Sequence, residues 1–106
     1  MSFQDMKKII DSGSLAEFKA RTARMTKEEV THPEAIHGHS IVTYLVASDK
    51  RTEMLTALLE SHQPDLNIRD GNKQTPLTTA AMSGNLRGLQ VLSNQSNINM
   101  NATEGE

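Results

Sequence analysis

The sequence predicts an all-α fold built from about three stacked helix-turn-helix units. Short segments with apolar residues three and four apart alternate with polar turns along the whole chain. Matching segments recur at a spacing of about 33 residues, as in a repeat architecture. Aromatic residues make up only 3% of the chain, so the core must come from aliphatic side chains, which suits thin layers of packed helices.

The first unit is predicted over residues 2–34. Two short helices are expected within residues 2–25, and Gly13 is expected to end the first because glycine adopts a left-handed cap without strain. Ser14 opens the second helix as part of a capping box, and Thr26 begins one further helical turn in the same way. The residues expected on the apolar faces are Phe3, Met6, Ile10, Leu15, Phe18, Thr22 and Met25.

The second unit is predicted over residues 35–69. Ser40 caps a helix that is broken at Asp49, and a second helix closes at Pro64. The apolar residues of that second helix are Met54, Leu55, Leu58 and Leu59.

The third unit is predicted over residues 70–101. Thr75 is a helix cap and Pro76 stands at the first helical position, where no backbone donor is needed. Gly84 allows the sharp turn between this helix and the next. The residues expected to face inward are Leu77, Ala80 and Ala81 on the first helix and Leu86, Leu89 and Leu92 on the second.

The repeat can be checked by position. Asp65-Leu66-Asn67 and Asn97-Ile98-Asn99 are 32 residues apart, and the caps Ser40 and Thr75 are 35 apart. The pair Leu55 and Leu58 recurs 34 residues later as Leu89 and Leu92.

The segment 70–86, Asp-Gly-Asn-Lys-Gln-Thr-Pro-Leu-Thr-Thr-Ala-Ala-Met-Ser-Gly-Asn-Leu, resembles the signature of the ankyrin repeat. The resemblance implies an ankyrin solenoid in which β-hairpin-like loops project from the helix pairs. Two positions depart from the family pattern, since Thr78 replaces the usual His and Lys73 replaces the usual hairpin Gly. The second unit departs further, with Ser40-Ile41-Val42-Thr43 at the signature and Asp49 at the turn.

The resemblance also implies a function, the binding of another protein in a concave groove formed by the hairpin tips and the first helix of each unit. Tyr44 is the candidate anchor, because aromatic residues are enriched at binding hot spots. The alternative is that Tyr44 packs against the first unit. Carried over by position, the groove residues are Ile36, His37, His39, Tyr44, Ala47 and Ser48 in the second unit and Gly71, Asn72, Gln74, Thr79, Met82 and Ser83 in the third.

Composition disfavours several other classes of function. The formal net charge of −2 is unlike that of a nucleic-acid-binding domain. The lysines and arginines of the first unit stand among acidic residues and are read as a solvated face, with an anionic partner as the alternative. The chain has no cysteine, no membrane-spanning segment and no signal peptide, which indicates a cytoplasmic protein. Delivery into a host cell, as by a bacterial effector, stays open.

No motif of an enzyme is present, so no cofactor, small-molecule substrate or catalytic residue is expected. His32, His37 and His39 with Glu34 have some spacing features of a zinc site but are read as loop residues. In the repeat register, residues 102–106 begin a fourth unit, which suggests that the natural protein is longer. The alternative function is then a targeting or scaffold arm of a larger enzyme or effector whose catalytic domain lies beyond residue 106.

Overall fold

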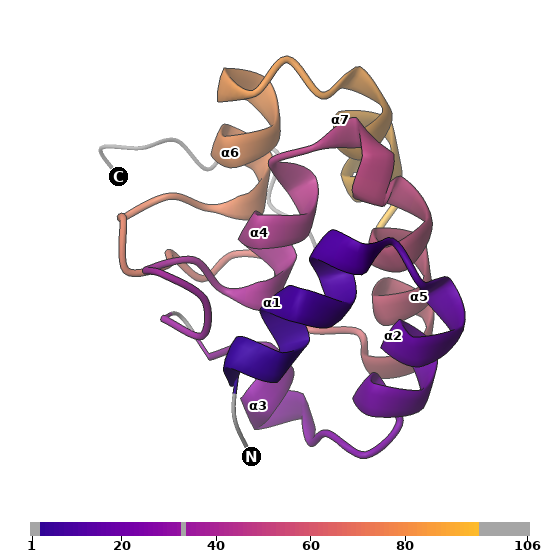
Figure 1. Ribbon diagram of the computed structural model, residues 1–106. Coiled ribbons are helices and arrows are strands. Elements are labelled where there is room, and N and C mark those ends of the chain that lie inside the picture. The colour runs from indigo at the N-terminus through magenta and orange to yellow at the C-terminus, as the bar shows by residue number, and fades with distance from the viewer. Residues whose placement is uncertain (1–2, 33, 96–106) are drawn as a thin grey trace.

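A computed structural model describes residues 3–32 and 34–95 of the chain. In Figure 1 the helices stand in three pairs, α1–α2, α4–α5 and α6–α7, with each pair packed against the next. Every regular element within the described ranges is helical, which confirms the all-α prediction. The predicted start of a fourth unit at residues 102–106 lies outside the described residues, as does the end of the third. The elements are α1 (Phe3–Ser12), α2 (Leu15–Thr22), α3 (Lys27–Val30), α4 (Ile41–Val46), the 3-10 helix η1 (Asp49–Arg51), α5 (Thr52–His62), α6 (Pro76–Met82) and α7 (Leu86–Ser93).

The first pair forms as its turn residues predict. Gly13 has a φ of +78° and separates α1 from α2, while the Ser14 side chain accepts a hydrogen bond from the Glu17 amide. Thr26 and Glu29 complete a reciprocal capping box that starts the single turn of α3. Phe18 of α2 has no exposed surface, and Met6 and Ile10 of α1 are buried as well, so apolar side chains from both helices hold this small pair together.

The second pair contributes most of the core. The hydrophobic side chains of α4, apart from the partly exposed Tyr44, are buried, and α5 buries a stripe of four that includes Leu55 and Leu58. Asp49 does break the inner helix, but it does so by starting η1, which runs directly into α5. The imidazole of His62 at the end of α5 lies 3.1 Å from the Met25 carbonyl, which links this pair to the first.

The third pair departs from the prediction on one side. Thr75 accepts from the Thr78 amide, Pro76 begins α6 and Gly84 takes a φ of +67°, all as expected. Ala80 and Leu92 are fully buried, but Ala81 is exposed and Leu86 is 76% exposed. These two inward assignments were wrong, because no described element lies over that side of α6 and α7. Leu77 and Leu89 are partly buried at its edge.

None of the helices within the described ranges has the length and apolar character needed to cross a membrane.

The stability of the fold should depend on the second pair. Replacing Leu55 with alanine removes a side chain with no exposed surface, and we expect the free energy of unfolding to fall by about 3 kcal/mol. The matched control, Leu86→Ala, removes the same atoms from an exposed position and should change it by less than about 0.5 kcal/mol. Urea unfolding followed by circular dichroism measures both. Equal losses would mean that Leu86 is covered in solution.

Candidate protein-binding surface

Two loops, at residues 36–39 and 70–74, contain tight turns and lead into α4 and α6. We call α4 and α6, the first helices of the second and third pairs, the inner helices. In the first, Ile36 and His39 form an antiparallel bridge with backbone hydrogen bonds of 2.9 and 2.8 Å. His37 and Gly38 between them have φ values of +49° and +84°, the left-handed conformation at both central residues that a two-residue hairpin requires. This loop is therefore a minimal β-hairpin, with the His37 side chain exposed at its tip.

The second loop, at residues 70–74, is closed by backbone hydrogen bonds from the Asp70 amide to the Gln74 carbonyl and from the Lys73 amide to the Asp70 carbonyl, both 2.9 Å. Lys73 has a φ of +66°, so it adopts the left-handed conformation for which the family uses glycine. The departure at this position changes the side chain at the tip but keeps the turn.

The two hairpin tips pack against each other. A Cβ atom added to Gly38 would lie 3.1 Å from the Asn72 side chain, and one added to Gly71 would lie 2.7 Å from Cγ of Glu34. The Asn72 side chain thus lies against the backbone at Gly38, where the positive φ also favours glycine, and the Glu34 side chain lies against the backbone at Gly71. The two tips lie side by side, and we call the loops at residues 36–39 and 70–74 together the hairpin edge.

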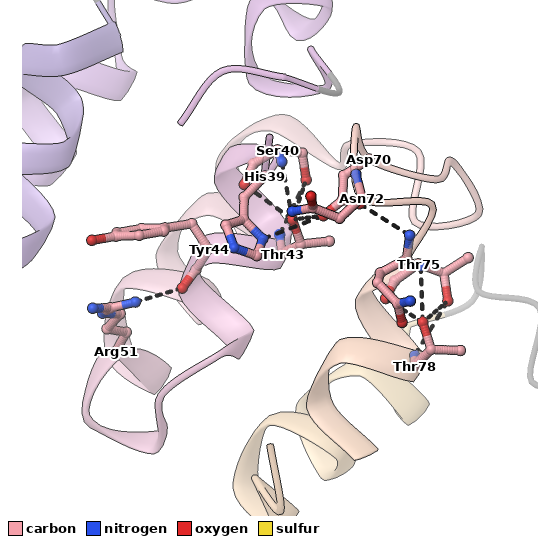
Figure 2. A network of polar contacts seen from close by, with 10 residues as sticks. His39, Ser40, Thr43, Tyr44, Arg51, Asp70, Asn72, Thr75 and Thr78 are labelled. Atoms are coloured by element: carbon pink, nitrogen blue, oxygen red, sulfur yellow. Dashed lines mark hydrogen bonds and ion pairs between the residues drawn. The ribbon is translucent and has the colours of Figure 1, made fainter. Parts of the chain in front are cut away.

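A buried carboxylate holds this edge in place (Figure 2). The Asp70 side chain has no exposed surface, and its Oδ1 accepts hydrogen bonds from the amides of Asn72 and Gln74 at 2.9 and 3.0 Å. Its Oδ2 accepts a 2.8 Å hydrogen bond from the Thr43 hydroxyl on α4. His39 Nδ1 lies 3.3 Å from the same oxygen, within ion-pair distance but outside hydrogen-bond geometry. One side chain thus joins the second hairpin to the first hairpin and to the first inner helix.

The inner helices begin with the same polar arrangement. The Ser40 side chain accepts from the Thr43 amide and the Thr43 side chain accepts from the Ser40 amide, and Thr75 and Thr78 repeat this arrangement on α6. Thr43 then uses its hydroxyl proton for Asp70. The Thr43 hydroxyl therefore makes a bond between two successive helix pairs in addition to its capping role.

Tyr44 packs against the first pair, which is the second of the two predicted roles. Its hydroxyl donates a 2.6 Å hydrogen bond to Asp11 Oδ1 at the end of α1. The Arg51 guanidinium lies 4.2 Å from the centroid of the Tyr44 ring, and its Nη1 donates to the Tyr44 carbonyl at 2.7 Å (Figure 2). Burial and the bond to Asp11 raise the pKa of the Tyr44 hydroxyl. The ring is consequently fixed between the first two pairs and is only partly exposed.

The other predicted groove residues divide by exposure. His37, Ala47, Gly71, Asn72, Met82 and Ser83 are exposed, and His39, Ser48 and Gln74 are partly exposed. Ile36 and Thr79 are 3% and 8% exposed, so their side chains have almost no surface to offer a partner. Ile36 enters the hydrophobic core at the base of the hairpin, and Thr79 shares the buried stripe of α6 with Pro76 and Ala80.

Two polar residues that hold this surface together were missed in the sequence. Thr43 was read as a departure from the family pattern, although its spacing from Ser40 is the spacing of Thr78 from Thr75. Asn85 is 3% exposed and donates a 2.9 Å hydrogen bond to the Val46 carbonyl, while its Oδ1 accepts from the Gly88 amide. The place of Asn85 directly before α7 indicates a helix cap, but no pattern in the neighbouring sequence indicates its hydrogen bond to the preceding pair.

The histidine cluster does not assemble into a metal site. His32 Nδ1 accepts a hydrogen bond from the Glu34 amide, and His39 is directed at Asp70. Within the part of the chain that the structure describes, no three histidine, aspartate or glutamate side chains converge to hold an ion.

The hollow with the greatest volume that we describe, about 740 Å³, is on the opposite side, among the second helices. It runs along α2, η1 and α5 and is lined by small side chains such as Thr56 and Ala57 together with charged ones such as Lys19 and Glu60. It is separate from the hairpin edge and holds none of the predicted groove residues.

Loss of the buried carboxylate should be costly. Asp70→Ala leaves the Thr43 hydroxyl and two loop amides without their acceptor, and we expect the free energy of unfolding to fall by about 3 kcal/mol. Asp65→Ala is the matched control, because the Asp65 side chain is exposed and accepts one local bond from the Asn67 amide, so it should cost less than about 1 kcal/mol. Chemical denaturation of both variants tests this, and similar losses would contradict the role given to Asp70.

The contact of Tyr44 with the first pair should make stability depend on pH. The hydrogen bond from Lys7, followed by that from Tyr44, holds the pKa of Asp11 below its usual value. A carboxyl group whose pKa is lower in the folded chain stabilises the fold above its unfolded pKa of about 3.9, and this contribution is lost as the pH falls through the folded pKa.

Asp11→Asn should therefore lower the free energy of unfolding at neutral pH, and its difference from the wild type should shrink as the pH falls from about 5 toward about 2. When both chains also carry Tyr44→Phe, which removes one hydrogen-bond donor to Asp11, the difference in unfolding free energy caused by Asp11→Asn should depend less on pH. A difference that stays constant with pH would show that the ionised carboxylate of Asp11 is not involved.

Residues 42–92 match the family model described as ankyrin repeats, many copies. Comparison with curated proteins gave no match, and comparison with solved structures also gave none. The matched range covers α4 to α7 and the second hairpin, the part of the chain in which the paired helices, the capped inner helices and the buried Asp70 were found. Residues 42–92 of the chain are therefore ankyrin repeats.

Proposed function

We propose that this protein is a non-enzymatic module that binds another protein along the hairpin edge and the exposed parts of α4 and α6. Ankyrin repeats are in general protein-binding modules and are typically non-catalytic. The observation that carries the proposal for this chain is the fixed hairpin edge. Side chains at its tips, such as His37 and Asn72, are exposed, whereas the backbone below them is held by the buried Asp70 network.

Preorganisation supports this assignment. A partner that binds exposed side chains on a fixed backbone does not have to order the loops first, and this lowers the entropic cost of association. Ala47, Met82 and Ser83 extend the exposed surface to the far ends of α4 and α6. Met82 is the apolar anchor in this proposal, because Tyr44 is bound to the first pair.

The charge distribution supports a protein partner over a nucleic acid. In the first pair, Lys7 is paired with Asp11 at 2.6 Å and Arg21 lies 3.4 Å from Asp5. These pairs reduce the positive potential that phosphate contacts would require. The proposed partner is therefore a protein, with no cofactor, small-molecule substrate or membrane span in the mechanism.

The three helix pairs support a division of the chain into repeat units. We infer repeats at residues 2–34, 35–69 and 70–101, and a cytoplasmic location consistent with a chain without cysteine.

The proposal predicts that the hairpin edge is needed for partner binding. In the double variant His37→Gly, Asn72→Ala, the glycine keeps the positive φ of the first tip, so the turns should stay intact while two exposed side chains are lost. A partner captured from lysate and identified by mass spectrometry, then purified, should bind this variant about tenfold more weakly in calorimetry.

The control is Glu60→Ala, Gln90→Ala, which alters exposed residues on the second helices. It should bind like the wild type. A partner that is lost by the control and kept by the hairpin variant would move the binding surface to the second helices and refute the proposal.

A further inference from the structure

His39 turns one edge of its ring toward the buried Asp70 carboxylate and the other edge toward solvent. Its Nδ1 atom is buried and lies 3.3 Å from Oδ2 of Asp70 (Figure 2). Nε2, on the other side of the ring, is not buried and makes no hydrogen bond within the described part of the chain. The side chain is 31% exposed, so Nε2 is the ring nitrogen that a partner at the hairpin edge can reach.

The Asp70 carboxylate has room for one more hydrogen-bond donor. The two oxygens of a carboxylate can accept about four hydrogen bonds. The amides of Asn72 and Gln74 donate to Oδ1, and the Thr43 hydroxyl donates to Oδ2. Three acceptor positions are therefore used, and the fourth belongs to the oxygen that faces His39 Nδ1. A proton on Nδ1 would serve this last position of a carboxylate that has no exposed surface.

This arrangement decides where neutral His39 carries its proton. A neutral imidazole has one N–H that donates and one bare nitrogen that accepts. A bare Nδ1 would point its lone pair at a carboxylate oxygen 3.3 Å away, in a buried place where water does not screen the repulsion. A proton on Nδ1 turns that repulsion into an attraction. A carboxylate at one ring nitrogen commonly fixes the tautomer of a histidine in this way.

The pair formed by His39 and Asp70 keeps a single negative charge when His39 is neutral. The ion-pair contact of Asp70 among the described residues is the one to His39. The nearby Arg51 is occupied elsewhere, since it lies 3.5 Å from Asp11 and stacks on the Tyr44 ring. That ring is 6.1 Å from the His39 ring and tilted by 56°, so it borders the imidazole without a hydrogen bond to it. The surroundings of Nε2 thus attract a donor and repel an acidic group.

From this geometry we propose that His39 selects the partner at the hairpin edge by presenting Nε2 as a hydrogen-bond acceptor. The partner group that fits is an N–H donor, such as a guanidinium or an amide, and a carboxylate is rejected. Asp70 is the positioning residue, because it keeps on Nδ1 the proton that would make Nε2 a donor. This inference rests on the function proposed above and adds the chemistry that the partner must supply.

The position of the proton can be measured in the free chain. Long-range 1H–15N NMR correlation spectra at a pH of about 8, where histidine is ordinarily neutral, distinguish a protonated ring nitrogen from a bare one. We expect His39 to carry its proton on Nδ1 and to have a bare Nε2. His37, exposed on the same hairpin, is the control and should exchange between both tautomers. A proton on Nε2 of His39 would overturn the inference, whatever partner the protein binds.

One substitution should reverse the polarity of Nε2. In Asp70→Asn the side-chain oxygen can still accept from the two loop amides. The NH₂ group then takes the place of Oδ2 and donates to Thr43 Oγ1 and to His39 Nδ1. Nδ1 must be bare to accept this bond, so the proton of His39 moves to Nε2. Asp65→Asn, at an exposed carboxylate, is the matched control and should leave the His39 signals unchanged.

Circular dichroism checks the fold of both variants, and the wild-type spectrum decides the proton position even if Asp70→Asn does not fold. An Asp70→Asn chain that folds and keeps the proton of His39 on Nδ1 would show that the carboxylate does not set the tautomer.

Two small probes test what Nε2 accepts. N-acetylargininamide supplies a guanidinium donor, and acetate supplies an acceptor. In the wild type we expect the guanidinium probe to shift the His39 Nε2 signal and acetate to leave it unchanged, with the order reversed in Asp70→Asn. A shift caused by acetate in the wild type, or no shift with either probe, would overturn the acceptor role. If a purified partner instead binds the second helices, the proposed function fails, and the selecting role of His39 falls with it while its measured proton position stands.

Discussion

The buried carboxylate of Asp70 holds the arrangement of the hairpins and inner helices together. A carboxylate without exposed surface is tolerated only when its oxygens are hydrogen-bonded, and here loop amides satisfy one oxygen while Thr43 satisfies the other. Because the loop amides belong to one repeat and Thr43 to the previous one, the same group closes the second hairpin and sets its distance from α4. The position of the exposed hairpin edge is therefore fixed by the buried Asp70 side chain beneath it.

The third pair depends on such polar bonds more than the others do. Beyond Asp70, the fully buried hydrophobic core of the described residues gains Ala80 and Leu92, with Leu89 and Val91 partly buried against it. Two directional contacts supplement this small apolar contribution, from Thr43 to Asp70 and from Asn85 to the Val46 carbonyl. Hydrogen bonds fix a relative orientation that small apolar side chains alone would leave loose. These two bonds help to hold the third pair against the second.

The sequence was sufficient to predict the repeat, the helix pairs and the residues that begin the helices, because capping and turn formation depend on neighbours a few positions away. Gly84, Pro76 and Thr26 are examples in which a local rule decided the structure correctly. Burial was predicted less well, since it depends on which element covers a residue. Ala81 and Leu86 continue an apolar pattern and yet are exposed, while Thr79 is buried. The bond of Tyr44 to Asp11 spans 33 residues, so no local pattern could decide its role.

The left-handed residues at the hairpin tips have a further consequence. His37 and Lys73 adopt positive φ values that glycine would adopt without strain, and each costs about 1 kcal/mol relative to glycine. In return, the points of the loops farthest from the core carry an imidazole and an ammonium group where glycine would leave bare backbone. At these two positions, which a neighbouring molecule contacts first, the chain carries a functional side chain at the expense of some backbone strain. A glycine substitution at either tip would make a more stable protein with less to distinguish one partner from another.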